Sequence, residues 1–183
     1  MADQAPAPTA AEDAALQEAL AAAHTAVWGY GVVGAATPVD GRAPVVEAEE
    51  AHRDLRDTVA ALLTSRQVDP VPAAAGYTLP APVVSAPDAA ALAVTLEDGT
   101  AQAWTWVLDQ ATERSTRELA VEALSAAELR AVGWRTAAGQ PATTDFPGLP
   151  DTSRRTRRDH SPGRRGRRRR RRRPRCWTAR PPP

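Results

Sequence analysis

The chain has 183 residues, which is enough for one ordinary domain and a tail but too few for two domains of average size. Its net charge of +1 hides two opposite parts: residues 1–150 hold 20 acidic residues against 8 arginines, and residues 151–183 hold 15 arginines against 2 aspartates. The single cysteine, Cys176, excludes a disulfide within the chain and a cysteine-based metal cluster.

The N-terminal residues have neither the basic region nor the long apolar region of a secretory signal peptide. No run of about 18 uninterrupted apolar residues occurs, so we expect no membrane span. These two observations favour a soluble cytoplasmic protein.

Residues 1–9 are rich in proline and alanine and are expected to be disordered. A first helix is predicted after Thr9, because Thr9 and Glu12 form a capping-box pattern. Pro38 and the Asp40-Gly41 pair end it. Core-type residues recur along it in steps of three and four: Leu16, Leu20, Ala23, Val27, Tyr30 and Gly34.

Three further helices are predicted, over residues 45–66, 87–112 and about 116–138, the last capped by Ser115 or Thr116. A proline-rich connection of about 20 residues separates the second from the third. The apolar stripes of these helices are Val45, Ala48, His52, Leu55, Val59 and Leu62; Ala89, Leu92, Leu96, Gly99, Ala103 and Trp106; and Leu119, Ala120, Leu124, Ala127, Ala131 and Trp134. The pattern predicts an all-α four-helix bundle with a long middle crossover.

The positions of the tryptophans relative to these apolar stripes predict which of them are buried. Trp106 and Trp134 fall on the stripes and are interpreted as core anchors, whereas Trp104 is expected to be partly exposed or in contact with another subunit. Aromatic residues at helical spacing belong to a core more often than to a ligand site.

The segment from Gly29 to Gly34 matches the dinucleotide-binding pattern G-x-G-x-x-G. That pattern works as a turn between a strand and a helix, where the glycines let the backbone approach a pyrophosphate. Here a helical run precedes the glycines and Pro38 follows soon after. We therefore interpret them as small residues that let a neighbouring helix or an aromatic ring pack closely.

Glu49 and His52 form a Glu-x-x-His motif, which places both side chains on one side of the second helix, as in di-iron and di-manganese bundles. Glu97 on the third helix and His24 on the first could complete a mononuclear site for iron or manganese. No second Glu-x-x-His motif accompanies them, so the alternative is that His52 is a core histidine hydrogen-bonded to a carboxylate and that Glu49 is a solvated charge. On the sequence alone, no bound cofactor is the simpler expectation.

Several separated motifs resemble a ferritin-like family that is common in actinobacteria and has no assigned biochemical role. They are the run from Ala21 to Ala35 (AAAHTAVWGYGVVGA), AHRDLRD from Ala51, AGYTLP from Ala75, Leu96-Glu97 and the ending FPGLP at Pro150. The resemblance covers about residues 12–150 and implies a ferritin-like bundle. The family's first helix usually has Glu-His where this chain has Ala23-His24, so the resemblance implies the fold more than it implies a metal centre.

The division is therefore a disordered N-terminus (1–9), a bundle (10–150) and a disordered basic tail (151–183). The tail contains seven consecutive arginines that would bind phosphate backbones without base selectivity: Arg167, Arg168, Arg169, Arg170, Arg171, Arg172 and Arg173. A GC-rich gene read out of frame gives the same composition, so a genuine tail and a frameshift product both stay open.

Three functions follow from these observations. The first is a ferritin-like bundle that acts by binding rather than by catalysis, as a homodimer through helix faces. The second is a metal-dependent redox bundle, and the third is non-specific nucleic-acid binding through the tail.

Overall fold

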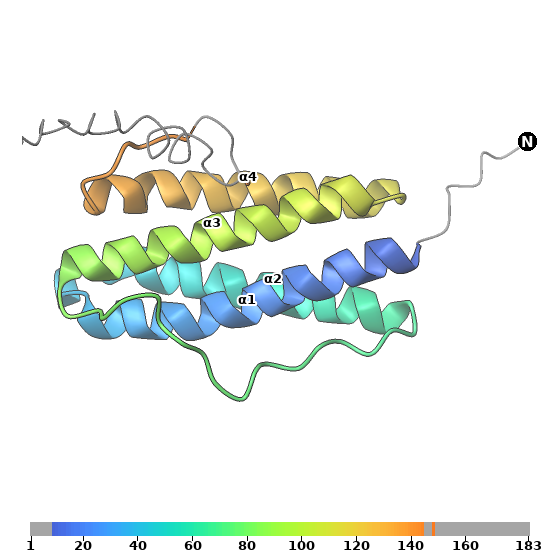
Figure 1. Cartoon of the computed structure of the whole chain (residues 1–183), viewed down its shortest axis with the longest axis horizontal. Helices are drawn as coiled ribbons and strands as arrows, with labels where there is room; N and C mark the ends of the chain where they lie inside the picture. Colours follow the sequence, from blue (N-terminus) through green and yellow to red (C-terminus); the bar gives the residue numbers. More distant parts are fainter. Residues whose placement is uncertain (1–8, 145–147, 149–183) are drawn as a thin grey trace, which may run out of the picture. The chain divides into compact units, whose positions relative to one another are not determined.

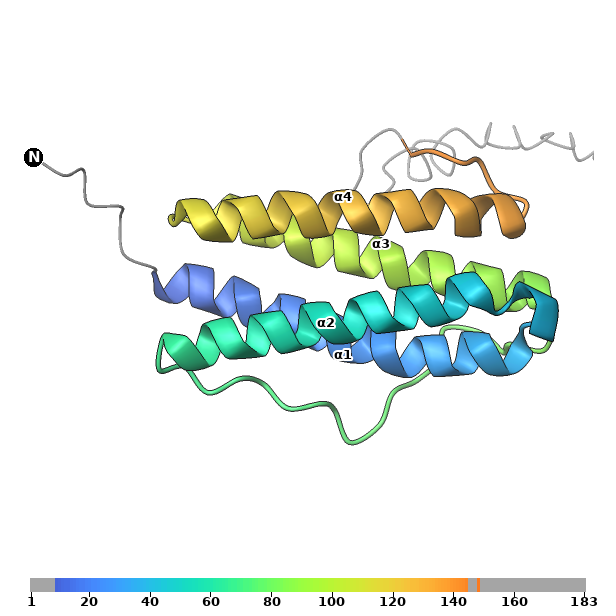
Figure 2. The same cartoon turned by 180° about the vertical axis from the view of Figure 1, so that it is seen from behind.

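The computed structural model describes residues 9–144 and Gly148. Figures 1 and 2 show helices running side by side as a bundle, with a long extended connection between the second and the third. Within the described residues the elements are α1 (Ala10–Ala36), the short 3-10 helix η1 (Val39–Gly41), α2 (Ala43–Ser65), α3 (Ala86–Gln110) and α4 (Arg114–Ala137). The predicted all-α four-helix bundle with a long middle connection is confirmed.

At the start of α1, one of the two residues of the predicted capping box, Thr9, acts as predicted, and the other, Glu12, does not. The Thr9 hydroxyl accepts a hydrogen bond from the backbone N–H of Glu12 at 3.1 Å, as the pattern predicts. The Glu12 carboxylate, however, is fully buried and binds Arg66 and Thr112. The start of α4 differs from the prediction, because Glu113 precedes the first turn and Thr116 lies buried inside it.

The core consists of two apolar clusters with a polar layer between them along the helices. One cluster contains Leu16, Leu20, Val59, Leu63 and Trp104. The other contains Val33, Val45, Ala48, Leu92 and Leu96, among others. On α2 His52 lies between the two clusters, and on α3 Glu97 and Thr100 do so.

The predicted core register of α3 is wrong in its second half. Trp104 is 0% exposed and Trp106 is 50% exposed, the reverse of the prediction. The buried face continues from Leu96 through Thr100 and Trp104 to Val107, whereas the prediction passed through Gly99. The cause is that the predicted stripe followed small and apolar residues and left out Glu97 and Thr100, which are polar and buried.

The glycines of the G-x-G-x-x-G pattern lie inside α1, where the backbone N–H groups serve the helix. A Cβ atom on Gly29 would lie 2.6 Å from a methyl carbon of Leu96 on α3, so this glycine lets α3 approach closely. The interpretation of close packing is thus confirmed at Gly29, and Gly31 faces open space.

Helix α1 is also long and apolar enough, by length and composition alone, to cross a membrane, which the count of uninterrupted apolar residues did not indicate. In the bundle it contacts both α2 and α3 along its buried face. A core helix of a soluble bundle passes the same test, so the hydropathy of α1 does not by itself place the protein in a membrane.

Gly29 and Gly31 provide a matched test of the close approach. Gly31→Ala should raise the free energy of unfolding by up to about 1 kcal/mol, because alanine is the better helix former. Gly29→Ala gains the same propensity but must displace the buried Leu96 side chain, so it should be less stable than Gly31→Ala by about 1–3 kcal/mol. Urea denaturation of the two variants measures this difference, and equal stabilities would contradict the packing role of Gly29.

Candidate functional site

A buried carboxylate on α3 binds side chains from the other three helices. Glu97 Oε1 accepts hydrogen bonds from the Tyr30 hydroxyl of α1 at 2.5 Å, from His52 Nε2 of α2 at 3.0 Å and from Arg130 Nε of α4 at 2.9 Å. Tyr30, His52 and Glu97 are 0% exposed. One oxygen atom therefore connects all four helices, and we call these four residues the Glu97 cluster.

The charges of this cluster are balanced. Burial favours a protonated Glu97, but the hydrogen bonds from His52 and Arg130 and the positive charge of Arg130 outweigh burial and hold the pKa of this carboxyl below its usual range. Burial, together with the neighbouring Glu97 charge, raises the pKa of Tyr30, so its phenol keeps the proton that it donates. Because Glu97 is an ionised acceptor, His52 Nε2 must be the donor in their hydrogen bond.

Ring contacts hold two of these side chains in place. The rings of Tyr30 and His52 stack with centroids 5.4 Å apart, and the Trp134 ring lies 6.1 Å from that of Tyr30. His52 Nδ1 and Glu97 Oε2 are buried and have no hydrogen-bond partner among the described residues. Each offers a lone pair to the interior, which is the chemistry of a hydrogen-bond acceptor or of a metal ligand.

The structure brings together two of the four residues that the sequence proposed as metal ligands, His52 and Glu97. His24 lies elsewhere, with Nε2 3.2 Å from the backbone oxygen of Val71, and Glu49 accepts a hydrogen bond from Arg53 at 2.5 Å. Among the described residues no group of three or more histidine, cysteine, aspartate or glutamate side chains could hold a metal ion. The seven arginines from Arg167 to Arg173 lie outside the described residues.

Sequence reasoning missed two members of the cluster. Tyr30 was on the predicted stripe of α1 but was assigned only to packing. Arg130 lies beside the stripe residue Ala131, and its long side chain reaches the core from the edge of α4. Only the need of a buried carboxylate for donors could have indicated a nearby arginine.

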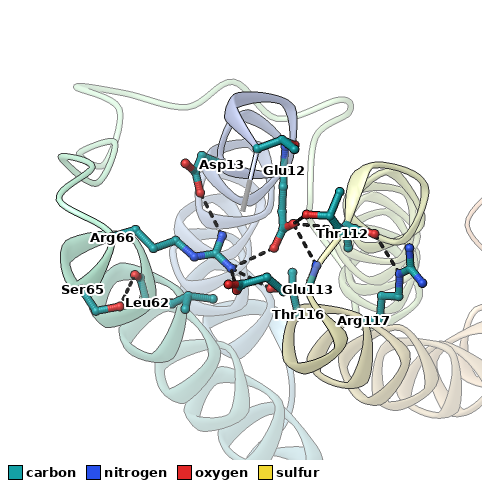
Figure 3. Close-up of polar contacts among 11 residues, drawn as sticks. Glu12, Asp13, Leu62, Ser65, Arg66, Thr112, Glu113, Thr116 and Arg117 are labelled. Carbon is teal, nitrogen blue, oxygen red and sulfur yellow. Dashed lines mark hydrogen bonds and ion pairs between the residues drawn. The ribbon is translucent and has the colours of Figure 1, made fainter. Parts of the chain in front are cut away.

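A second buried carboxylate lies at the end of the bundle where α1 begins (Figure 3). Arg66, which follows α2, donates hydrogen bonds to Glu12, Asp13, Glu113 and the Thr116 hydroxyl. The other oxygen of Glu12 accepts from the backbone N–H and hydroxyl of Thr112, each at 2.7 Å. This network joins the start of α1 to the end of α2 and to the α3–α4 turn.

Burial of Glu12 alone would raise its pKa, but hydrogen bonds from Thr116, Thr112 and Arg66 lower it to about 2. The residues around Glu12 are therefore already paired with one another. This arrangement is that of a structural clamp, in which no acid or base is left free to exchange a proton with a substrate.

The outer face between α1 and α3 carries a shallow groove of about 710 Å³. Small residues of both helices line it, among them Ala21, Ala22, Gly99 and Ala103, and Gly148, which follows α4, lines it as well. Trp106, Glu18 and Asp109 also line it, and the Trp106 indole is half exposed. An exposed indole beside small residues is typical of a surface that binds another protein.

A family model described as a domain of unknown function, DUF4439, matches residues 15–151. The chain belongs to the DUF4439 family. A conserved hypothetical protein from Mycobacterium tuberculosis, Rv2844, has a similar crystal structure, with 40% identity and a TM-score of 0.69 over 71% of this chain and 98% of that one. No match is found among curated proteins.

The DUF4439 match covers α2, α3, α4 and most of α1, so the Glu97 cluster and the α1–α3 groove both lie in the family domain. Glu12 precedes the matched residues. The mycobacterial relative and the bundle confirm a helical family with an actinobacterial member, and neither the description of the family nor the name of the relative states a biochemical role.

Tyr30→Phe tests the Glu97 cluster of this DUF4439 domain. Removing the phenol leaves a buried, charged acceptor with one donor fewer, which should lower the free energy of unfolding by about 1.5–3 kcal/mol. Tyr77→Phe is the matched control, because the Tyr77 hydroxyl accepts one exposed backbone bond from Ala74. Tyr77→Phe should lower the free energy of unfolding by less than about 0.5 kcal/mol. Equal losses in urea denaturation would contradict the role of the phenol.

Glu12→Gln tests the clamp through the pH dependence of stability. A depressed pKa contributes stability that is present above the ordinary value of 4.5 and is lost as the pH falls toward about 2. Glu12→Gln should remove about 3 kcal/mol at neutral pH and flatten the decline across this window. Glu118→Gln, at an exposed pair with Arg114, should leave the wild-type profile unchanged. Parallel profiles of Glu12→Gln and wild type would contradict the clamp.

Proposed function

We propose that this DUF4439 protein is a ferritin-like bundle that acts by binding a protein partner through the α1–α3 groove, without catalysis. The observation that carries the proposal is the half-exposed Trp106 beside a groove of small residues. Tryptophan is enriched among the residues that dominate binding energy at protein interfaces.

The chemistry of the interior supports binding over catalysis. The side chains best suited to acid–base work, Tyr30, His52 and Glu97, are fully buried and bonded to one another. A general acid or base must reach the proton that it transfers within hydrogen-bond distance of a substrate. These groups therefore serve the fold, and the groove is the better candidate for contact with another molecule.

The partner that we propose is a second copy of the chain. On α3, Trp106 stands seven residues, about 10 Å, from Gly99. A two-fold axis across the groove would place the indole of each copy over the small residues of the other, which makes the surface self-complementary. The same two-fold axis would place the acidic ends of the two grooves, at Glu18 and Asp109 of each copy, apart from each other.

Sedimentation velocity of the full chain tests this proposal. The wild type should sediment as a dimer at micromolar concentration, and Trp106→Arg should sediment as a monomer. Leu129→Arg is the matched control, because Leu129 is 75% exposed on α4 and does not line the groove. It should leave the dimer intact. A wild-type monomer at all concentrations, or equal effects of the two variants, would overturn the homodimer.

The two other functions stay predictions. A metal-dependent redox role has the His52–Glu97 pair in its favour, whereas His24 and Glu49 have other partners. Nucleic-acid binding depends on the arginines from Arg167 to Arg173, and it predicts an affinity for DNA that falls steeply with salt concentration.

A further inference from the structure

The Glu97 cluster contains two side chains of the types that bind metal ions, Glu97 and His52, and an arginine that binds the same carboxylate. A carboxylate on α3 and an imidazole on α2, 3.0 Å apart, are the donor types that bind transition metals in helical bundles. The described residues supply no third such donor. The oxygen that faces His52 also accepts a hydrogen bond from the Arg130 guanidinium at 2.9 Å. The donor set therefore does not fit a protein-built metal centre, and it already holds a cation.

We infer that Arg130 is the built-in cation of the Glu97–His52 pair, and that it excludes divalent metal ions from a position that becomes a metal site once Arg130 is removed. A metal ion at Glu97 Oε1 would have to share one oxygen with the Tyr30 hydroxyl, with His52 and with Arg130. A second cation beside the guanidinium would also be repelled by it at short range.

The burial of the three side chains supports the same conclusion. The Arg130 side chain is 22% exposed, whereas those of His52 and Glu97 are 0% exposed. Among the described helices, α2 and α4 hardly contact each other directly, so Arg130 extends inward from α4 on a side where direct helix packing is weak. The guanidinium therefore neutralises the carboxylate and also covers the pair against solvent.

Truncation of Arg130 would leave a definite set of donors. Glu97 Oε2 and His52 Nδ1 are buried acceptors with no partner among the described residues, and Glu97 Oε1 would lose the guanidinium donor. Imidazole and carboxylate ligands suit Zn²⁺ and Co²⁺, and water molecules can complete the coordination. The ligand class of the unmasked site is thus a borderline divalent transition metal.

Cobalt(II) titration of the full chain, followed by visible absorption and by thermal unfolding, tests the inference. Arg130→Met should bind one Co²⁺ at least about tenfold more tightly than the wild type, with a rise in Tm that the wild type does not show. His52→Ala in the Arg130→Met background should abolish this binding. Arg114→Met, at an arginine whose side chain is 90% exposed, should behave as the wild type does.

Binding of Co²⁺ to the wild type as tight as to Arg130→Met would overturn the inference. So would a folded Arg130→Met that binds no metal, or binding that survives the loss of His52. If Arg130→Met is unfolded, metal rescue becomes the readout. Recovery of cooperative unfolding on addition of Co²⁺ would support the inference, and no recovery in either Arg130→Met or Arg130→Gln would contradict it.

Discussion

The bundle depends on one buried negative charge that must be satisfied. Glu97 is fully buried on α3, and its carboxylate is ionised because Tyr30, His52 and Arg130 donate to it from α1, α2 and α4. Leaving such a charge without donors costs several kcal/mol, and breaking a buried ion pair is strongly destabilising. Any shift of one helix along its neighbours would remove a donor, so the carboxylate fixes the relative register of all four helices.

This constraint matters because much of the core is alanine. The buried faces of α1 and α4 contain Ala15, Ala19, Ala23, Ala120 and Ala127 among others, and such small side chains interlock weakly. Large apolar residues such as Trp104 anchor one cluster, but they do not alone select a single register. The Arg66–Glu12 network adds a second polar connection where α1 begins. Two buried carboxylates therefore provide the specificity that alanine packing lacks.

The helices could be predicted well because caps, prolines and apolar spacing are local signals. The ends of α1, α2 and α3 were placed within about two residues, and the long connection was identified as a crossover. Gly29 was correctly interpreted as a site of close packing, since its helical context was visible in the chain. These features required no knowledge of what lies across the bundle.

The failures arise where a buried polar residue gains its partners from another helix. Glu97 and Thr100 belong to the core face, and their polarity shifted the predicted register, so Trp104 and Trp106 were exchanged. Thr116, one of the two residues predicted as a cap, instead accepts a hydrogen bond from Arg66. Of the four residues proposed as ligands of one metal site, only His52 and Glu97 lie together. Arg130 has no local signal at all, because the carboxylate that it binds lies on another helix.

Urea denaturation of Glu97→Gln at neutral pH tests the central role of this carboxylate most directly. Glutamine keeps the shape of the side chain but removes its charge and replaces one oxygen by a donor group. We expect a loss of about 3–5 kcal/mol, because Arg130 and Tyr30 lose their charged acceptor. A loss below about 0.5 kcal/mol, the range of an ordinary surface substitution, would contradict this role.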